Sequence, residues 1–428
     1  MSYLIVFRVS PDVDHMAPLA WKLLEDGEEV HAVVAPGYDV EADHRLGILR
    51  AYERFHLHRP GGGLDGRWRA TLPYALWLVR RHRIRLVAVE WGYGIPAGYE
   101  RPRSAAGLAA IVRTLGASLL RAGSNAQQPR ASFIAAARLC GAAVVCLPHG
   151  LTVKLDAASN GEVAELLERG ALDWSDRNRF DAYVLNTEHH RRIHLDHARG
   201  DPDVMQTWGS LRWSPEWFEL NRRLAPPLAW PGPPSARVKV AFMVPKWRNR
   251  VDAPATIALF RRLHELDAIS LAVVGHPRPG TGGGDPLRAA AGIDWSRVHD
   301  LSRHNSVSII READVVIDAG SSIGIEVLMQ DKVLVNPSYL HELETLFDTV
   351  AGCCVVARDA DDVVGYLLAH ASGRRHRTSP DARAELLRHA VYGSSEEPYD
   401  VIGLYAERVR ALAAGRGDGG RRAARSDP

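Results

Sequence analysis

The stretch that decides the fold is Asp318-Ala-Gly-Ser-Ser-Ile-Gly-Ile-Glu326, which joins two short apolar runs. Residues 315–317 before it and 333–335 after it are rich in β-branched side chains, which is typical of buried strands in a parallel sheet. Between them, Gly320 permits a tight turn, and two serines lie where a helix begins. The pattern predicts a strand, a small-residue turn, a short helix and a second strand.

The same stretch predicts a binding site for a phosphorylated ligand. The N–H groups and the positive dipole end of a helix favour an anion, and the hydroxyls of Ser321 and Ser322 add donors. Glu326 lies about one turn further on, within reach of a sugar or ribose hydroxyl. Each of these residues also has a purely structural explanation. Serine is a common N-cap, and glutamate in a first turn complements the helix dipole.

Length and composition predict a globular protein of two domains. The 428 residues are too many for one compact core, and 46% of them are hydrophobic. The net charge of +2 gives no strong field for nucleic acid, and four cysteines are too few for a disulfide scaffold, so reduced thiols are expected. The apolar run at residues 1–7 lacks the basic residues of a signal peptide, and no window matches a membrane span, so a cytoplasmic location is expected.

A proline-rich stretch divides two series of strands and helices. Residues 225–234 contain five prolines, which cannot form the interior of a helix or strand. The expected organisation is an N-terminal, acceptor-side Rossmann-like domain (1–224), a linker (225–236), a C-terminal, nucleotide-donor-binding Rossmann-like domain (237–398), a helix that can cross back to the first domain (399–414) and a disordered tail (415–428).

Hydrophobic periodicity predicts the elements of both domains. The expected strands are residues 4–9, 29–35, 86–90, 143–147, 182–186, 205–208, 238–244, 270–274, 315–317, 333–335 and 354–357. The expected helices include residues 16–25, 131–139, 255–265 and 361–371. The alternation of strands and helices indicates an α/β protein with two parallel sheets.

A histidine follows the expected strand 143–147, where α/β enzymes place their ligands. It belongs to Pro148-His149-Gly150, and imidazole can take a proton from an acceptor hydroxyl because its pKa lies near neutrality. Lys154 comes soon after and can bind an anion. The structural alternative is a histidine that packs in a tight turn.

Two further loops follow expected strands of the second domain. In Gly275-His276-Pro277, the proline makes the turn rigid, and His276 can donate to a phosphate. In Pro245-Lys246-Trp247-Arg248, the arginine suits bidentate phosphate binding and the lysine supplies a point charge. An ordinary loop histidine and a solvated basic loop are the alternatives.

Two other patterns are interpreted as structural. His190, His194 and His197 share one face of an expected helix that also contains His189, but no cysteine or carboxylate completes a ligand set, so no metal site is predicted. Residues 68–85 combine apolar and arginine positions, which favours a helix packed on the sheet, with contact to an anionic membrane surface as the alternative.

In this order, the motifs resemble those of GT-B glycosyltransferases, most closely the CDP-glycerol glycerophosphotransferase branch and related capsule enzymes. The family-like steps, found within residues 144–335, are His149-Gly150, Gly209-Ser-Leu-Arg212, Pro245-Lys-Trp-Arg248, His276-Pro277 and Asp318-Ala-Gly-Ser-Ser322. The His-Pro and Ser-Ser pairs also occur in CMP-sugar transferases of the sialyl and Kdo type. The chain departs from the family pattern at Lys246, where the family has threonine, and by one extra residue between Asp318 and the two serines. No role is assigned to Asp318.

The resemblance implies two Rossmann-like parallel-sheet domains facing across a cleft. It also implies an inverting, metal-independent transfer from a nucleotide-activated donor to an acceptor hydroxyl in bacterial surface polysaccharide synthesis. His149 would be the base, with Gly150 and Lys154 on the acceptor side. The residues expected to hold the donor phosphates and nucleotide are Lys246, Arg248, His276, Pro277, Gly320, Ser321, Ser322 and Glu326.

The resemblance favours a CMP-sugar or CDP-polyol donor, with a UDP-linked donor as the alternative, and no further cofactor. The implied acceptor is a saccharide or lipid-linked glycan, which places the protein in the cytoplasm or peripherally at the inner face of the membrane. A UDP-sugar 2-epimerase with the same fold is the competing enzyme. It needs carboxylates to remove a proton from carbon, and Glu90 is the candidate at a strand end. A third possible function is that of an inactive nucleotide-binding protein. The presence of His149 and His276 argues against it.

Overall fold

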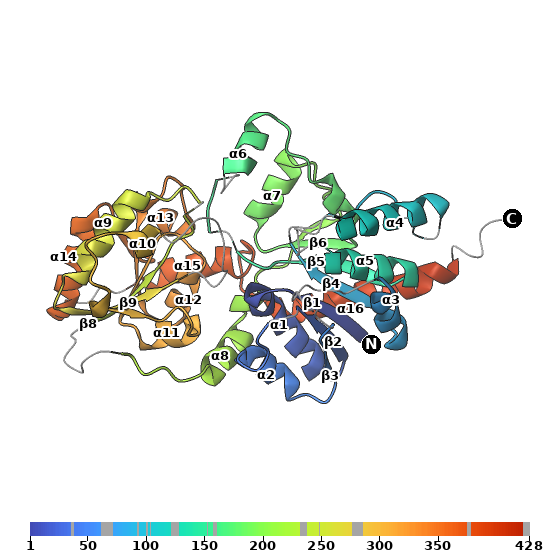
Figure 1. The fold of residues 1–428 in the computed structure, drawn as a ribbon, viewed down its shortest axis with the longest axis horizontal. Helices are drawn as coiled ribbons and strands as arrows, with labels where there is room; N and C mark the ends of the chain where they lie inside the picture. The colour runs from blue at the N-terminus through green and yellow to red at the C-terminus, as the bar shows by residue number, and fades with distance from the viewer. Residues whose placement is uncertain are drawn as a thin grey trace. The chain divides into compact units, whose positions relative to one another are not determined.

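The structure is a computed structural model. It describes residues 1–35, 38–60, 72–91, 94–99, 102, 104–120, 128–151, 153–156, 161–231, 238–247, 249–275, 286–374 and 378–422. The chain forms two compact units, each built on one sheet (Figure 1). Unit 1 contains Met1–Gly150, Leu172–Phe218 and Val391–Pro428, and unit 2 contains Leu151–Ala171 and Glu219–Ala390.

Unit 1 is built on a seven-stranded parallel sheet with the order β3-β2-β1-β4-β5-β6-β7. Its strands are β1 (Ser2–Phe7), β2 (Glu29–Val34), β3 (Phe55–His58), β4 (Leu86–Glu90), β5 (Ala143–Leu147), β6 (Ala182–Leu185) and β7 (Met205–Thr207). Its helices are α1 (Ser10–Glu25), α2 (His44–Arg50), α3 (Leu72–Arg81), α4 (Ala105–Leu120), α5 (Gln128–Cys140), α7 (Glu188–His197) and α16 (Val401–Arg422), with the 3₁₀ turns η1 (Ser175–Arg179) and η2 (Leu211–Trp213).

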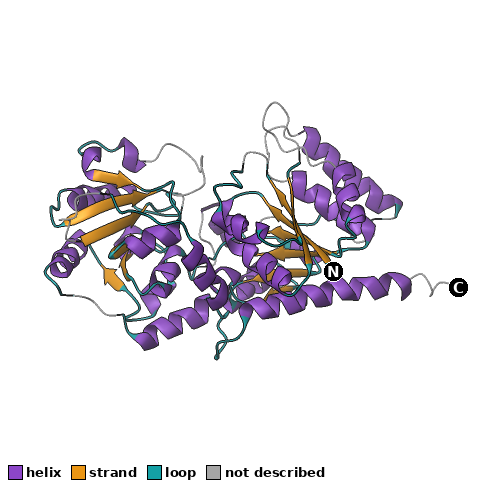
Figure 2. Cartoon of the chain, turned by 90° about the horizontal axis from the view of Figure 1, so that it is seen from below, coloured by secondary structure: helices purple, strands orange, loops and turns teal. Residues whose placement is uncertain are grey.

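Helices cover both faces of this sheet (Figure 2). One layer contains α3 and α5, which pack on each other, and the other contains α1 and α16. Strands β4 and β5 are therefore buried along their whole length, which explains their continuous apolar sequences. Helix α3 buries Ala75, Leu78 and Val79 in the core, as expected for a helix packed on the sheet.

Unit 2 is built on a six-stranded parallel sheet with the order β10-β9-β8-β11-β12-β13. Its strands are β8 (Val238–Met243), β9 (Ile269–Val274), β10 (Val298–Asp300), β11 (Val315–Asp318), β12 (Val333–Pro337) and β13 (Val355–Ala357). Its helices and 3₁₀ turns are α6 (Gly161–Glu168), α9 (Ala253–His264), α10 (Pro286–Ala289), η3 (Trp295–Arg297), α11 (Ser306–Glu312), α12 (Ile323–Met329), η4 (Ser338–Leu340), α13 (Leu346–Thr349), α14 (Ala360–Ala371) and α15 (Pro380–Ala390), while α8 (Pro215–Leu224) spans the boundary between the units.

The expected N-terminal domain is not continuous, because residues 151–171 belong to unit 2. Backbone hydrogen bonds hold this segment beside residues 344–346. The Leu155 N–H donates to the Glu344 carbonyl at 3.0 Å, and the Leu346 N–H donates to the Val153 carbonyl at 2.8 Å. A pairing between segments so far apart in the chain leaves no signal in local periodicity.

The described part of the proline-rich stretch, residues 225–231, belongs to unit 2 and packs on it. The Ser308 hydroxyl donates to the Pro226 carbonyl at 2.6 Å, and the Trp230 indole N–H donates to the Ser270 hydroxyl at 3.0 Å. The chain passes from unit 1 to unit 2 earlier, between Phe218 and Glu219. Prolines stop helix and strand pairing, but they do not prevent a segment from packing on a neighbouring surface.

The C-terminal helix α16 belongs to unit 1. The Tyr405 hydroxyl donates to the Gly209 carbonyl at 2.9 Å, and its ring packs edge-on against Trp208 with centroids 5.0 Å apart. Helix α16 continues to Arg422, although a disordered tail was expected from residue 415. Four glycines lie in this extension, and nothing in the structure explains why it is helical.

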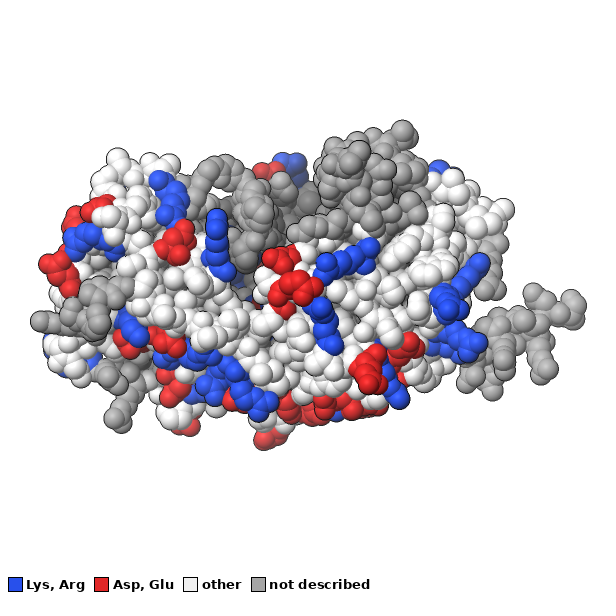
Figure 3. Space-filling view, turned by 60° about the horizontal axis from the view of Figure 1, so that its bottom comes forward, with Lys and Arg blue, Asp and Glu red and all other residues white. Residues whose placement is uncertain are grey.

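The face of the molecule drawn in Figure 3 shows no dominant charge where it is described. On the face drawn in Figure 3, basic and acidic side chains lie interspersed, in keeping with the net charge of +2. None of the helices in the described ranges has both the length and the apolar character to cross a bilayer. The four cysteines are free thiols, and three of them are buried.

Candidate functional site

In both sheets the strand order reverses at one point, where α/β proteins bind ligands. In unit 2 this point lies between β8 and β11, with β9 next to β8. The last residues of the three strands form one row, because Val274 pairs with Met243 and Met243 pairs with Asp318. The loops with the three expected donor-binding motifs therefore leave the sheet side by side. Lys246 is exposed in the β8 loop, while Arg248, His276 and Pro277 lie outside the described residues.

The turn after β11 is organised by Asp318. This carboxylate is buried, and it accepts hydrogen bonds from the Ser321 hydroxyl at 2.7 Å and the Ser321 N–H at 2.8 Å. The Ser321 oxygen in turn accepts the Ile323 N–H at 3.3 Å. Ser321 thus acts as a cap within the turn, whereas Ser322 is the half-buried N-cap residue of α12 and makes no side-chain capping bond. Because α12 has only seven residues, an anion here would depend on side chains more than on the helix dipole.

Glycine is required at position 320. Its φ of +66° lies in the left-handed region, and a Cβ there would meet Thr345 Cγ2 at 2.8 Å and His341 Nε2 at 3.0 Å. His341 is buried beside the turn, and burial lowers its pKa, while Asp348 opposes this shift. The sequence contains no motif that identifies His341, since its proximity to Gly320 arises only from the fold.

Lys154, expected on the acceptor side, lies in the segment that belongs to unit 2. It is buried, and its ammonium donates to the Asn249 carbonyl at 3.3 Å. Burial lowers the pKa of Lys154 to about 8, against the opposing charges of Asp156 and Asp318. Burial also raises the pKa of Asp318 to about 6, although the bonds from Ser321 and the charge of Lys154 oppose it. The turn therefore has a buried cation and a buried carboxyl group close together.

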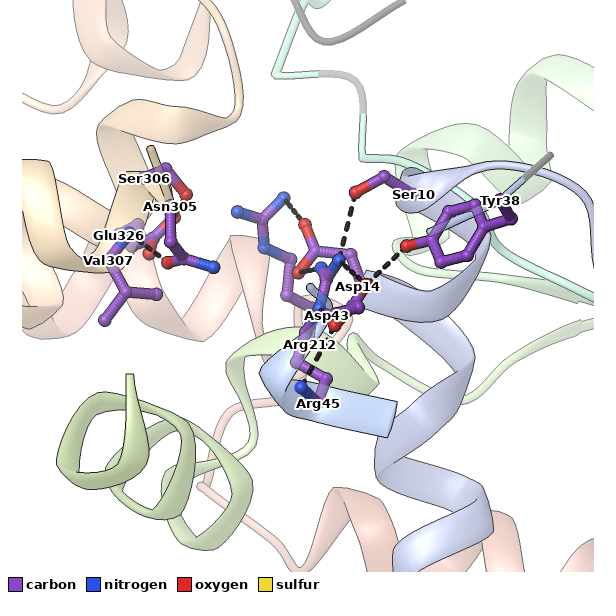
Figure 4. Close-up of polar contacts among 10 residues, drawn as sticks. All are labelled: Ser10, Asp14, Tyr38, Asp43, Arg45, Arg212, Asn305, Ser306, Val307 and Glu326. Atoms are coloured by element: carbon purple, nitrogen blue, oxygen red, sulfur yellow. Dashed lines mark hydrogen bonds and ion pairs between the residues drawn. The ribbon is translucent and has the colours of Figure 1, made fainter. Parts of the chain in front are cut away.

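Glu326, expected to contact a ribose or sugar hydroxyl, is buried in unit 2. It accepts a hydrogen bond from the Ser306 hydroxyl of α11 at 3.2 Å (Figure 4). In the same turn, the Asn305 side chain caps α11 by accepting the Val307 N–H at 2.8 Å. In this structure Glu326 therefore links α12 to α11.

In unit 1, His149 follows β5 as expected and lies at a fixed loop. Its ring packs edge-on against Trp91, with centroids 6.1 Å apart, and the Trp91 indole donates to the Val184 carbonyl at 2.6 Å. The Gly150 carbonyl accepts from the Asn186 side chain at 2.6 Å. The ends of β4, β5 and β6 together position the imidazole. His190 packs on the same indole and is buried, which lowers its pKa to about 3 and keeps it neutral.

An ion pair lies between β1 and β4, where the strand order of the unit 1 sheet reverses. Arg8 follows β1, and its Nε lies 2.5 Å from Oε1 of Glu90, the fully buried last residue of β4. The backbone N–H of Arg8 also donates to Asp12 at 2.8 Å. The carboxylate of Glu90 is therefore engaged by a cation.

Arg212, from the expected Gly-x-x-Arg step, belongs to a buried network at the start of α1 (Figure 4). It lies 2.7 Å from Asp14, and Arg45 lies 2.5 Å from the same carboxylate. Burial alone would raise the pKa of Asp14, but Arg212 and then Arg45 outweigh it and lower the pKa. Arg45 also binds Asp43 at 2.6 Å, and Tyr38 donates to Asp43. This network ties the loop after β7 to α1 and α2.

Comparisons with solved structures identify the architecture. A putative UDP-N-acetylglucosamine 2-epimerase from Listeria monocytogenes is similar, with a TM-score of 0.51, 12% identity and coverage of 94% of this chain and 98% of the other. S. aureus MnaA, solved with UDP, gives 0.50 at 12% identity over 93% and 99%. The wall teichoic acid polymerase TagF gives 0.50 at 8% identity over 97% and 90%.

The chain has the GT-B fold, with two Rossmann-like parallel-sheet domains. The sequence matches no protein-family model, and a search of characterised proteins by sequence gives no match. At these identities the structural likeness establishes the fold and leaves the activity to be inferred from the site.

We predict that Gly320→Ala destabilises unit 2 by about 1–3 kcal/mol, because the new Cβ adds backbone strain and contacts Thr345 and His341. Gly365→Ala in α14 is the matched control, since a Cβ there meets nothing within 4 Å and alanine favours the helix. Chemical denaturation of both variants measures the difference. Equal stabilities would show that the turn relaxes without cost.

We predict a pH dependence of stability that arises from Asp318. Its pKa rises from the usual 3.8 to about 6 in the folded state, so between these values the folded protein binds a proton that the unfolded chain has lost. Stability should therefore fall as the pH rises through this window, by about 3 kcal/mol. Asp318→Asn should remove this slope in urea titrations, while Asp381→Asn at an exposed position should retain it. A slope that is unchanged in Asp318→Asn would contradict the assignment.

Proposed function

We propose that this protein is a nucleotide-sugar-dependent transferase, which moves a glycosyl or glycerophosphoryl group to an acceptor hydroxyl. The observation that supports this most directly is the row of strand ends Val274, Met243 and Asp318, which places side by side the three loops that we propose to bind phosphate. The position of His149 at a strand end of the other sheet supplies a candidate base. The GT-B fold is compatible with this activity and with others.

The donor is proposed to bind at the β9, β8 and β11 loops. Ser322 offers a hydroxyl at the start of α12, Gly320 lets the backbone approach closely, and Lys154 adds an ammonium group. Lys246, Arg248, His276 and Pro277 complete the proposed phosphate seat from the neighbouring loops. Ser321 would act through the turn that it holds with Asp318, and Glu326 by positioning α12 on α11.

The proposed reaction is a direct displacement that inverts the configuration. His149 takes the proton from the acceptor hydroxyl as its oxygen forms a bond to the donor's reacting atom. That atom is the anomeric carbon of a sugar or the phosphorus of a glycerophosphoryl group. Its bond to the nucleotide phosphate breaks, and the nucleotide leaves with the electron pair. Fixed donors such as Lys154 and Ser322 stabilise the charge on that phosphate, and no metal ion is needed there.

A cytidine nucleotide is the proposed carrier, because the His-Pro and Ser-Ser pairs resemble those of CMP- and CDP-dependent enzymes. MnaA, a GT-B neighbour solved with UDP, makes uridine the alternative. The proposed acceptor is a saccharide or lipid-linked glycan of the cell envelope, reached in the cytoplasm or at the inner face of the membrane.

A UDP-sugar 2-epimerase is the second candidate. One similar structure is named as a putative UDP-N-acetylglucosamine 2-epimerase, and another, MnaA, was solved with UDP. The pairing of Glu90 with Arg8 argues against it, because a buried carboxylate held by arginine is a poor base toward carbon. Incubation with a UDP-sugar in the absence of acceptor distinguishes the two activities. Formation of an epimer would overturn the transferase proposal.

We predict that His149→Ala lowers the rate of transfer by about 10²–10⁴-fold, the usual contribution of a general base. The control is His197→Ala, at an exposed position of α7. The assay follows release of nucleotide from CMP- and CDP-linked donors with saccharide acceptors. Unchanged transfer in His149→Ala would remove this histidine from the mechanism.

We predict that a cytidine nucleotide raises the melting temperature more than UDP or GDP does, because a ligand that binds only the folded state stabilises it. Lys154→Met and Ser322→Ala should each weaken nucleotide binding by about 10-fold, because each removes a phosphate contact. Lys22→Met, in the last turn of α1 in unit 1, where Lys22 pairs with Asp26, is the control. A larger shift with UDP or GDP would exclude the cytidine preference, and full binding by Lys154→Met would exclude Lys154 from the phosphate seat.

A further inference from the structure

Four histidines and a glutamate, all residue types that can bind a metal, lie together in unit 1. They are at the edge of the sheet opposite to β7. Strands β2 and β3 are paired with His31 opposite His56. Side chains two residues apart on a strand project from the same face, so Glu29 joins His31 and His58 joins His56 on that face. His82, just after α3, completes the group from outside the sheet. Five residues from three segments thus converge on one place.

The imidazoles of His31, His58 and His82 lie at ligand-binding distances. Nδ1 of His31 is 2.9 Å from Nε2 of His58, and the rings of His31 and His82 have centroids 4.2 Å apart. One nitrogen from each of the three rings lies within 4.8 Å of the others. Tetrahedral zinc, with bonds of about 2.0–2.1 Å, places its nitrogen ligands about 3.3 Å apart. A small rotation of the half-buried rings of His58 and His82 would close that difference.

We propose that His31, His58 and His82 bind a zinc ion. Three imidazoles suit zinc and related transition metals, whereas calcium and magnesium prefer sets of oxygen ligands. The fourth ligand would be water or the neighbouring imidazole of His56, whose Nε2 lies 3.1 Å from the Glu29 carboxylate.

The surroundings of His31 match those of a metal-binding histidine. His31 is fully buried, and while its Nδ1 faces His58, its Nε2 lies 3.4 Å from the Glu29 carboxylate. Glu29 is itself held by the Ser2 hydroxyl at 2.7 Å. A carboxylate on the second nitrogen orients a ligating imidazole and raises its basicity.

The proposed ion would have a structural role. In the sheet order β3-β2-β1-β4-β5, the site lies at β2 and β3, whereas His149 follows β5. Zinc would fasten the short edge strand β3 and the end of α3 to β2. The inference is independent of the proposed transfer reaction, because it uses none of the same residues.

The test uses the full-length protein without a histidine tag, stripped with a chelator and dialysed. Isothermal titration calorimetry with zinc should show that one ion binds per chain. Cobalt(II), as a spectroscopic substitute, should give the visible absorption of a tetrahedral site with nitrogen ligands. His58→Ala and His82→Ala should each weaken metal affinity by at least about 10-fold. His197→Ala, from the histidine-rich helix α7, should bind as the unaltered protein does.

Stability provides a second readout that does not depend on the transfer activity. Zinc should raise the melting temperature of the unaltered protein and of His197→Ala, and should leave that of His82→Ala unchanged. His82 is suited to this measurement because it is only partly buried, so its replacement leaves the fold intact. Absence of stoichiometric binding, or equal affinity in His58→Ala, His82→Ala and the unaltered protein, would overturn the proposal.

Discussion

The buried carboxylate of Asp318 is the constraint on which the candidate donor site depends. It ends β11 at the point where the strand order reverses, and it holds Ser321 by two hydrogen bonds. That geometry requires Gly320 at positive φ, closely packed by Thr345 and His341. Burying the ionised carboxylate of Asp318 costs free energy, and the charge of the nearby Lys154 offsets part of this cost. These contacts hold the turn, and Ser322 at its end is the residue proposed to contact the ligand.

Lys154 reaches this turn because the chain changes units twice within a short distance. Gly150 ends the first part of unit 1, residues 151–171 pack in unit 2, and the chain then returns at Leu172. The His149–Gly150 step and Lys154 are only a few residues apart in sequence, yet they belong to different units. A candidate base and a candidate phosphate ligand are thereby connected by one short segment, whose position is set by its backbone pairing with residues 344–346.

Unit 1 uses histidine in two physically distinct ways. His149 and His190 pack on Trp91 near the carboxyl ends of β4, β5 and β6. His31 and its neighbours instead line the face of an edge strand, where several imidazoles close together would repel one another if they were protonated. The first arrangement suits proton transfer and the second suits metal binding. The difference lies in the surroundings of each ring, since the residue type is the same.

The sequence by itself determined the α/β class, the two sheets and the order of the motifs. Strands β4 and β5 were predicted to the residue, because a strand buried on both faces is a continuous apolar run that local pattern reveals. Strands β3 and β10 were missed, because they are short and contain polar residues. Tertiary structure alone decided that Lys154 belongs to unit 2, that Arg8 engages Glu90, that His341 packs against Gly320 and that four histidines converge with Glu29. Parallel strand pairing brings Arg8 to Glu90 and joins the histidines of β2 and β3, whereas an antiparallel bridge to Thr345 holds Lys154 in unit 2. Neither kind of pairing is encoded in a local stretch of sequence.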